Sequence, residues 1–128
     1  MENRESYFEH YGRRYVRTSR WNIAAKMSKD ARQWTKVEVP NIAAGGLLFQ
    51  TDKTFAIEDI VWFDLEIEPM MMGLMGTLHI KKQKAVVVAD RGAQENMNSY
   101  AVEFLEMSEK HRISLDELIH LTNTRFGK

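Results

Sequence analysis

Apolar and polar residues alternate along much of the middle of this chain, between residues 20 and 105. In the clearest stretch four apolar positions alternate with four others: Val61, Phe63, Leu65 and Ile67 against Trp62, Asp64, Glu66 and Glu68. Because successive side chains of a β-strand point to opposite faces, this period of two predicts a strand with one face toward a core and the other toward water.

Six further segments show this period or the short apolar run of a buried strand. They are Trp21–Met27, Thr35–Val39, Leu47–Phe49, Leu74–Lys81, Ala85–Ala89 and Tyr100–Phe104. We expect Pro40 to end the second of these segments, and a connection near Lys82-Gln83 to join Leu74–Lys81 to Ala85–Ala89. Short strands separated by turn-rich loops are typical of an all-β barrel or sandwich.

The pattern changes after Leu105 to that of a helix. Ser114-Leu115-Asp116-Glu117 has the form of a capping box, in which the Ser hydroxyl and the Glu carboxylate each satisfy a free backbone N–H, so it predicts a helix start. The stripe that follows is apolar: Leu115, Leu118, Ile119 and Phe126. The sequence therefore predicts a C-terminal helix that packs on the sheet structure or plugs it, whereas residues 1–12 suit a short helix or a loose arm.

Composition narrows the class of protein. A length of 128 residues suits one domain, and the absence of cysteine excludes disulfides, thiolate metal sites and a thiol nucleophile. No apolar run approaches the ~18 residues that span a membrane. The polar start Met1-Glu2-Asn3-Arg4-Glu5 also lacks the apolar stretch of a signal peptide, so we expect a cytoplasmic protein without membrane insertion.

The net charge is zero, which argues against a nucleic-acid polymer as partner, but the charge is unevenly spread. Residues 10–40 hold eight Lys/Arg against two Asp/Glu, while residues 57–68 hold five Asp/Glu and no Lys/Arg. A basic segment in a neutral protein favours a small anionic ligand, with a merely solvated basic face as the alternative.

No pattern in the sequence supports catalysis. None of the four histidines, His10, His79, His111 and His120, has a partner at the i, i+4 spacing of a helical zinc site. His79 alternates with apolar neighbours, which predicts an outward strand residue and not a metal ligand. A nucleophile elbow, a phosphate loop and a dinucleotide fingerprint are all missing, so we expect no enzyme, no metal site and no cofactor.

Two segments carry signals for binding. Arg13, Arg14, Arg17 and Arg20 cluster just before the first clear strand, flanked by Tyr11 and Tyr15. Arginine presents a planar fork of donors that matches phosphate and the guanine edge and also stacks on flat rings. The second segment is Asn41-Ile42-Ala43-Ala44-Gly45-Gly46, where Asn favours a turn and paired glycines permit positive φ or close approach of a ligand. A plain turn between strands is the alternative interpretation.

In order and spacing these segments resemble the PilZ domain family, whose members carry an RxxxR motif and then [D/N]xSxxG at the start of a strand. Arg13 and Arg17 match the first motif, and Asn41 and Gly46 match the ends of the second. The segment 99–108, Ser-Tyr-Ala-Val-Glu-Phe-Leu-Glu-Met-Ser, resembles the last strand of the family, and the resemblance covers roughly residues 10–125.

The resemblance implies a mostly β fold, a six-stranded antiparallel barrel with a C-terminal α-helix. It divides the chain into an N-terminal arm, residues 1–9, and a barrel domain with its helix, residues 10–128. It also implies a non-catalytic receptor for the bacterial second messenger cyclic di-GMP that acts on a protein partner in motility or exopolysaccharide regulation. The implied ligand-binding residues are Arg13, Arg14, Arg17, Asn41, Gly45 and Gly46.

The chain departs from the family pattern at two positions. Ala43 replaces the motif serine, which removes a hydrogen bond worth about 1 kcal/mol, and Ala101 replaces the glycine of the last strand. The departure at Ala43 keeps a second hypothesis open, in which the chain is a protein-interaction adaptor that no longer binds nucleotide. The methionine-rich segment Met70–Met75 fits that hypothesis, because methionine surfaces are soft and adaptable, with packing in the core or in a hairpin as the alternative interpretation.

Overall fold

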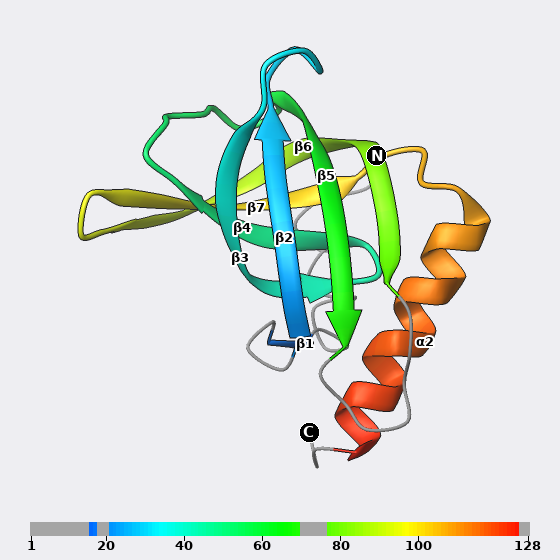
Figure 1. The fold of residues 1–128 in the computed structure, drawn as a ribbon. Helices are drawn as coiled ribbons and strands as arrows, with labels where there is room; N and C mark the ends of the chain where they lie inside the picture. The colour runs from blue at the N-terminus through cyan, green and yellow to red at the C-terminus, as the bar shows by residue number, and fades with distance from the viewer. Residues whose placement is uncertain (1–15, 18–20, 70–76, 126–128) are drawn as a thin grey trace, which may run out of the picture.

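The computed structural model describes residues 16–17, 21–69 and 77–125, and Figure 1 shows a barrel of strands with one helix beside it. The strands in this part of the chain are β1 (Val16–Arg17), β2 (Trp21–Ser28), β3 (Thr35–Ala43), β4 (Gly46–Thr51), β5 (Ile60–Pro69), β6 (Leu78–Gln94) and β7 (Met97–Phe104). They are followed by the helix α2 (Glu109–Arg125).

Six strands close into a ring. Their order is β3-β2-β5-β6-β7-β4, and an additional pairing of β3 with β4 joins the two ends. Every pairing is antiparallel, and the two-residue strand β1 adds to the edge of β3. The predicted six-stranded antiparallel barrel with a C-terminal helix is therefore confirmed.

The alternating residues of β5 fill the barrel as the sequence predicts. Val61, Phe63, Leu65 and Ile67 are fully buried, and they belong to one core cluster that receives inward side chains from β2 to β7 and from α2. Figure 1 shows how the strands wrap around this core. Burying a large apolar side chain contributes roughly 1.5–3 kcal/mol, so this cluster is the main source of stability.

The prediction that Pro40 ends its strand is wrong. β3 continues through Pro40 to Ala43, and its pairing with β4 shifts by one residue between Glu38 and Asn41. Proline has no N–H to donate to a ladder, but a bulge leaves one residue unpaired and so accommodates it. As a result, Asn41 lies within the strand and not at its end.

The expected connection near Lys82-Gln83 is also wrong, because β6 is one strand from Leu78 to Gln94. The strand is irregular at this point: its register with β5 shifts between the pairs made by Phe63 and Leu65. Lys82 has a positive φ of 51°, which lies outside the range of a regular strand, and its N–H donates to Asp64 Oδ1 at 2.7 Å. The polar pair therefore marks a bulge and not a turn.

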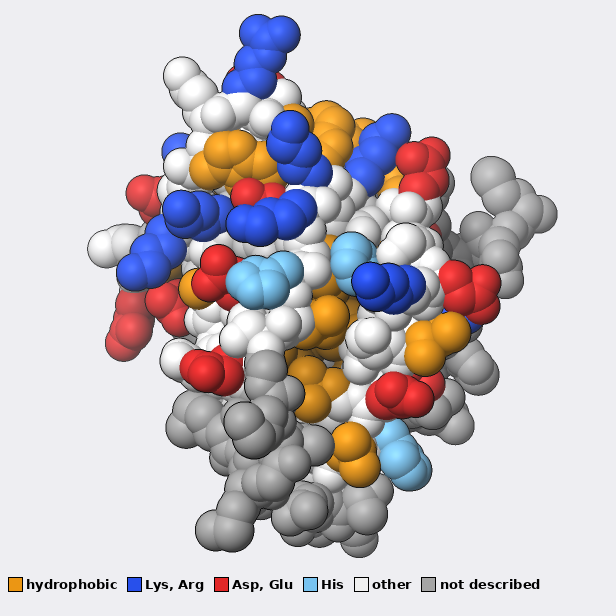
Figure 2. Space-filling model, turned by 45° about the vertical axis from the view of Figure 1, so that its right-hand side comes forward, with side chains coloured by type: hydrophobic (Ala, Val, Ile, Leu, Met, Phe, Trp, Pro, Cys, Tyr) orange, Lys and Arg blue, Asp and Glu red, His pale blue; other side chains and the backbone are white. Residues whose placement is uncertain are grey.

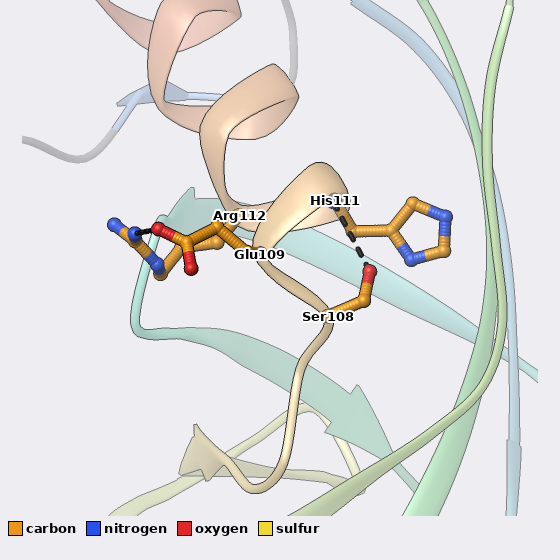
Figure 3. Close-up of polar contacts among 4 residues, drawn as sticks. All are labelled: Ser108, Glu109, His111 and Arg112. Carbon is orange, nitrogen blue, oxygen red and sulfur yellow. Dashed lines mark hydrogen bonds and ion pairs between the residues drawn. The ribbon is translucent and has the colours of Figure 1, made fainter.

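Helix α2 begins earlier than its predicted cap. Ser108 caps it, because the hydroxyl Oγ accepts a hydrogen bond from the N–H of His111 at 3.2 Å (Figure 3). Glu109 then places a carboxylate in the first turn, where the helix dipole favours negative charge. Ser114 lies inside the helix, so the prediction of a start there is wrong. Among residues 16–17, 21–69 and 77–125, no helix is long and apolar enough to span a bilayer.

The apolar stripe of α2 faces the barrel. Leu115 and Ile119 are buried in the core cluster and Leu118 packs against it, as predicted, while Phe126 lies outside the described residues. A buried hydrogen bond of 2.9 Å runs from Trp21 Nε1 at the start of β2 to Thr122 Oγ1. The helix is thus fixed to the barrel by both apolar and polar contacts.

Replacing Thr122 with valine is expected to lower the free energy of unfolding by about 1–3 kcal/mol, because the indole N–H of Trp21 would stay buried without an acceptor. Urea denaturation measures the change. Thr122→Ser keeps the hydroxyl and serves as the control, so equal stability of Thr122→Val and wild type would show that the bond contributes nothing.

Candidate ligand-binding site

The sheet register brings the two predicted binding segments together. In the β1–β3 ladder Arg17 lies opposite Asn41, and Val16 lies opposite Ile42. Residues opposite each other on antiparallel strands have Cα atoms about 4.5–5.5 Å apart. Arg17 and Asn41 are therefore neighbours on adjoining strands, although 24 positions separate them along the chain. The other arginines and tyrosines of the first segment, Arg13, Arg14, Arg20, Tyr11 and Tyr15, lie outside the described residues.

The second segment forms the end of a hairpin. Asn41 pairs with Leu48 on β4 as well as with Arg17 on β1, and Ala43 pairs with Gly46. The connecting loop is therefore only Ala44-Gly45, so the predicted six-residue turn from Asn41 to Gly46 is wrong in extent. Asn41 is half-buried at the centre of a three-stranded segment and is held there by its backbone pairing.

The two glycines of this hairpin are not needed for a left-handed backbone. Among the glycines that the structure describes, only Gly92 has a positive φ. Gly45 and Gly46 are buried, and the carbonyl oxygen of Gly45 accepts a hydrogen bond of 2.9 Å from the N–H of Phe104 on β7. The sequence suggests two reasons for these glycines, a positive φ and close approach of a ligand. Because neither glycine has a positive φ, close approach, which the absence of a side chain permits, is the reason that remains.

The outer side of the barrel near this hairpin carries apolar residues. Ala43 follows the core residue Ile42 and so points outward, yet it is only 1% exposed. A second hydrophobic cluster of buried residues lies on β6 and β7 and consists of Val86, Val88, Ala89 and Ala101, with Leu48 of β4 and Leu105 packed against them. Leu48, which pairs with Asn41, thus links this apolar cluster to a polar Asn41 and a cationic Arg17, a combination of residue types that suits a ligand with planar rings and negative charge.

Two residues that neighbour the hairpin on β7 were missed as site residues. Glu103 lies opposite Gly46, and Ala101 lies opposite Leu48. The alternation in Tyr100–Phe104 already places both outward, but the alternation does not say which strand lies next to β4. Pairing between β4 and β7 joins segments about fifty residues apart, so only the closed sheet reveals this part of the site.

The carboxylate of Asp30, away from the candidate site, stabilises a loop. The pKa of Asp30 is lowered from its ordinary value because the backbone N–H groups of Gln33 and Arg32, and then the Ser28 hydroxyl, donate to its carboxylate. These bonds of 2.9–3.0 Å fix the β2–β3 loop, at the opposite end of β3 from Asn41.

His79 is exposed, as predicted, with its Nδ1 3.8 Å from Glu66 Oε2. Within the described ranges of the chain, no three metal-ligating side chains of the His, Cys, Asp or Glu type gather into a site. The pairing of His79 with Glu66 on the outside of the barrel is that of a solvated surface contact, which contributes little to stability.

Comparison with known proteins identifies relatives of this architecture. A family model described as the PilZ domain matches residues 12–121. Solved structures with the same fold include the Bacillus subtilis inhibitor of motility MotI/DgrA (TM-score 0.68, 16% identity, covering 87% of this chain and 51% of that one). They also include Escherichia coli YcgR in complex with c-di-GMP (TM-score 0.61, 12% identity, covering 87% and 45%).

A third structure, the Borreliella burgdorferi PlzA protein in complex with c-di-GMP, has a TM-score of 0.54 and 11% identity, covering 94% of this chain and 56% of that one. The chain thus spans about half the length of these three proteins. A search of curated proteins finds no match. At these identities the structural likeness establishes the fold.

Proposed function

This chain belongs to the PilZ domain family, a family of cyclic di-GMP receptors, and from that premise we propose that it binds cyclic di-GMP on the outer face of the β3–β4 hairpin. The observation that carries the proposal is the β1–β3 ladder, which sets Arg17 opposite Asn41. Two motif segments that are separate in the sequence thereby adjoin, and Leu48, which pairs with Asn41, packs against the second hydrophobic cluster.

The chemistry of the ligand matches these residues. Cyclic di-GMP carries two phosphodiesters and two guanines, so it needs cationic donors and flat apolar surface together. Arg13, Arg14 and Arg17 supply guanidinium groups, which bind phosphate with charge-assisted bonds and read the O6/N7 edge of guanine bidentately. Asn41 contributes an amide that both donates and accepts, and Gly45 and Gly46 let the ligand approach the backbone.

Binding is proposed to act by changing the N-terminal arm together with the arginine segment that follows it, and not by catalysis. Helix α2 contacts both β1 and β3, so ordering of the arginine segment on the ligand takes place beside the helix. A ligand that binds one arrangement of the arm more tightly shifts the population toward it. The surface that the arm and the helix present to a protein partner then changes with the concentration of the ligand.

Isothermal titration of the purified chain with cyclic di-GMP tests the proposal directly. Saturable heat with a dissociation constant in the micromolar range or below is the expected result. Absence of heat would instead favour the adaptor without nucleotide, the hypothesis that the alanine at position 43 supports.

Restoring the motif serine with Ala43→Ser is expected to strengthen binding about fivefold, because one neutral hydrogen bond contributes about 1 kcal/mol. Titration of the two proteins side by side measures the gain. Ala44→Ser, one residue further along the same buried hairpin, is the matched control and should leave affinity unchanged. An equal gain in both variants would argue against a specific contact at position 43.

A further inference from the structure

The outer face of β5 carries an aromatic side chain that the core does not use. Trp62 lies between the fully buried residues Val61 and Phe63, so it points away from the barrel interior, and it is half-buried. Its Cα partners are Ser28 on β2 and Lys84 on β6. Aromatic side chains are enriched at protein interfaces, so this outward Trp62 beside a lysine is a candidate for contact with a partner molecule.

The bulge in β6 adds two lysines to this face. In a regular strand consecutive side chains point to opposite sides, but Lys81 and Lys82 are both exposed, and Gln83 turns inward. The left-handed φ of Lys82 is strained for a residue with a side chain, and the bond from its N–H to Asp64 holds it there. Bulges re-aim side chains, and here the strained backbone presents an additional lysine.

A depression of about 260 Å³ lies next to this bulge on the outside of β2, β3, β5 and β6. Its lining combines two alanines with charged side chains of both signs: Ala24, Ala25, Lys26, Lys36, Asp64, Glu66 and Lys81. Figure 2 shows blue side chains gathered over the upper part of the face that includes β5 and β6, with orange and red side chains between them. The surface is therefore basic, uneven and interspersed with carboxylates.

We propose that this Trp62–lysine surface, defined as Trp62, Lys26, Lys81, Lys82 and Lys84, docks an acidic segment of a partner protein that carries an apolar side chain. The lysines attract carboxylates, and Trp62 supplies an aromatic anchor of the kind found at interface hot spots, which becomes buried when the partner binds. The depression offers a concave surface into which the partner segment can fit. The carboxylates of Asp64 and Glu66 would repel a uniformly anionic membrane or nucleic acid, whereas a protein segment can place its own charges between them.

The Trp62–lysine surface is centred on β5, whereas the hairpin site lies on β3 and β4, and the depression reaches β3 only at Lys36, near the opposite end of that strand from Asn41. In the ring order β3-β2-β5-β6-β7-β4, strand β5 is three steps from β4 in either direction. None of the residues that define the Trp62–lysine surface belongs to the hairpin site, so the inference does not depend on whether cyclic di-GMP binds.

The test uses ¹⁵N-labelled full chain and a synthetic acidic peptide of twelve residues, rich in Glu and Asp with two leucines. The expected result is saturable chemical-shift change at the Trp62 indole and the amides of Lys81, Lys82 and Lys84, with none at Asn41 or Gly46. Trp62→Ala is expected to weaken peptide binding about tenfold, as for an interface hot spot. The double variant Lys82→Glu/Lys84→Glu is expected to abolish saturation.

The matched control is Lys110→Glu, an exposed charge reversal on α2 that should leave peptide affinity unchanged. Absence of shifts at millimolar peptide, or equal losses in the Lys110 and lysine-pair variants, would overturn the proposal. Vesicles containing one third phosphatidylserine are tested as a second binding target. Trp62-dependent binding to the vesicles but not to the peptide would show that this surface binds a membrane and not a protein. Thermal melts establish that each variant is folded before titration.

Discussion

Replacing Arg17 with alanine is expected to weaken cyclic di-GMP binding about a hundredfold. Hydrogen bonds to charged groups contribute about 1.5–3 kcal/mol each, and a guanidinium commonly makes two to one phosphate or guanine edge. Losing the pair at about 3 kcal/mol corresponds to roughly two orders of magnitude in the dissociation constant. Alanine keeps the backbone N–H and C=O that pair with β3, so the ladder opposite Asn41 is retained.

Titration calorimetry on three variants separates the role of Arg17 from general effects of charge. Arg17→Lys keeps the charge but loses the planar fork, so an intermediate loss of about tenfold is expected. Arg112→Ala is the matched control, because Arg112 is an exposed arginine on α2 that forms an ion pair with Glu109 at 2.9 Å (Figure 3). Binding by Arg17→Ala with wild-type affinity would refute the assignment of the arginine motif.

Much of the barrel could be predicted because its strands follow local rules. The strict alternation of β5 identifies the inward residues one by one, and all four are buried. The errors fall at irregular positions. Pro40 is a strand breaker in a regular ladder, yet a bulge removes the need for its missing N–H. Similarly, the polar pair at Lys82-Gln83 imitates a turn, because a bulge stabilised by Asp64 requires the same kind of residue.

The helix has two candidate N-caps in the sequence, Ser108 and Ser114. Ser108 and Ser114 both precede good helix-forming residues, and only Ser114 is followed by a Glu three positions later. The structure uses Ser108 because β7 ends at Phe104, and a helix that starts soon afterward can still carry Leu115 and Ile119 into the core. Tertiary packing therefore overrides the local capping-box signal at Ser114.

The sequence offers the residue types of the candidate site but not their spatial arrangement. The arginine pair, the asparagine and the glycines stand in the order of the family motifs, and the alternation of β7 already points Ala101 and Glu103 outward. The pairing of Arg17 with Asn41, and of β4 with β7, depends on closure of the barrel. Closure is a non-local property, so a single sequence gives the components of the site without their neighbours.

Replacing Phe49 with alanine is expected to lower the free energy of unfolding by about 4 kcal/mol, the largest stability effect among these variants. Phe49 is 0% exposed and lies at the centre of an aromatic group. Its ring centroid is 5.2 Å from that of Phe63 and 5.9 Å from those of Phe55 and Tyr100. Alanine would leave a cavity that the closed barrel cannot collapse to fill, and the edge-to-face contacts would be lost as well.

Urea denaturation of Phe49→Ala and of two control variants tests whether the loss of stability comes from the core. Phe49→Leu keeps most of the volume and should cost about 1.5 kcal/mol or less, and Ile57→Ala, at an exposed loop position, should stay within about 0.5 kcal/mol of wild type. A stability of Phe49→Ala close to that of wild type would contradict the assigned core.

Saturating cyclic di-GMP provides the decisive comparison, because a ligand at a hundred times its dissociation constant stabilises the folded state by about 2.7 kcal/mol. Phe49→Ala should be destabilised yet still gain this increment, since Phe49 points into the core and away from the outer face of the hairpin. Arg17→Ala should be as stable as wild type without ligand and gain almost nothing with it. Opposite responses of these two variants would show that the barrel positions the site while the arginine segment supplies its affinity.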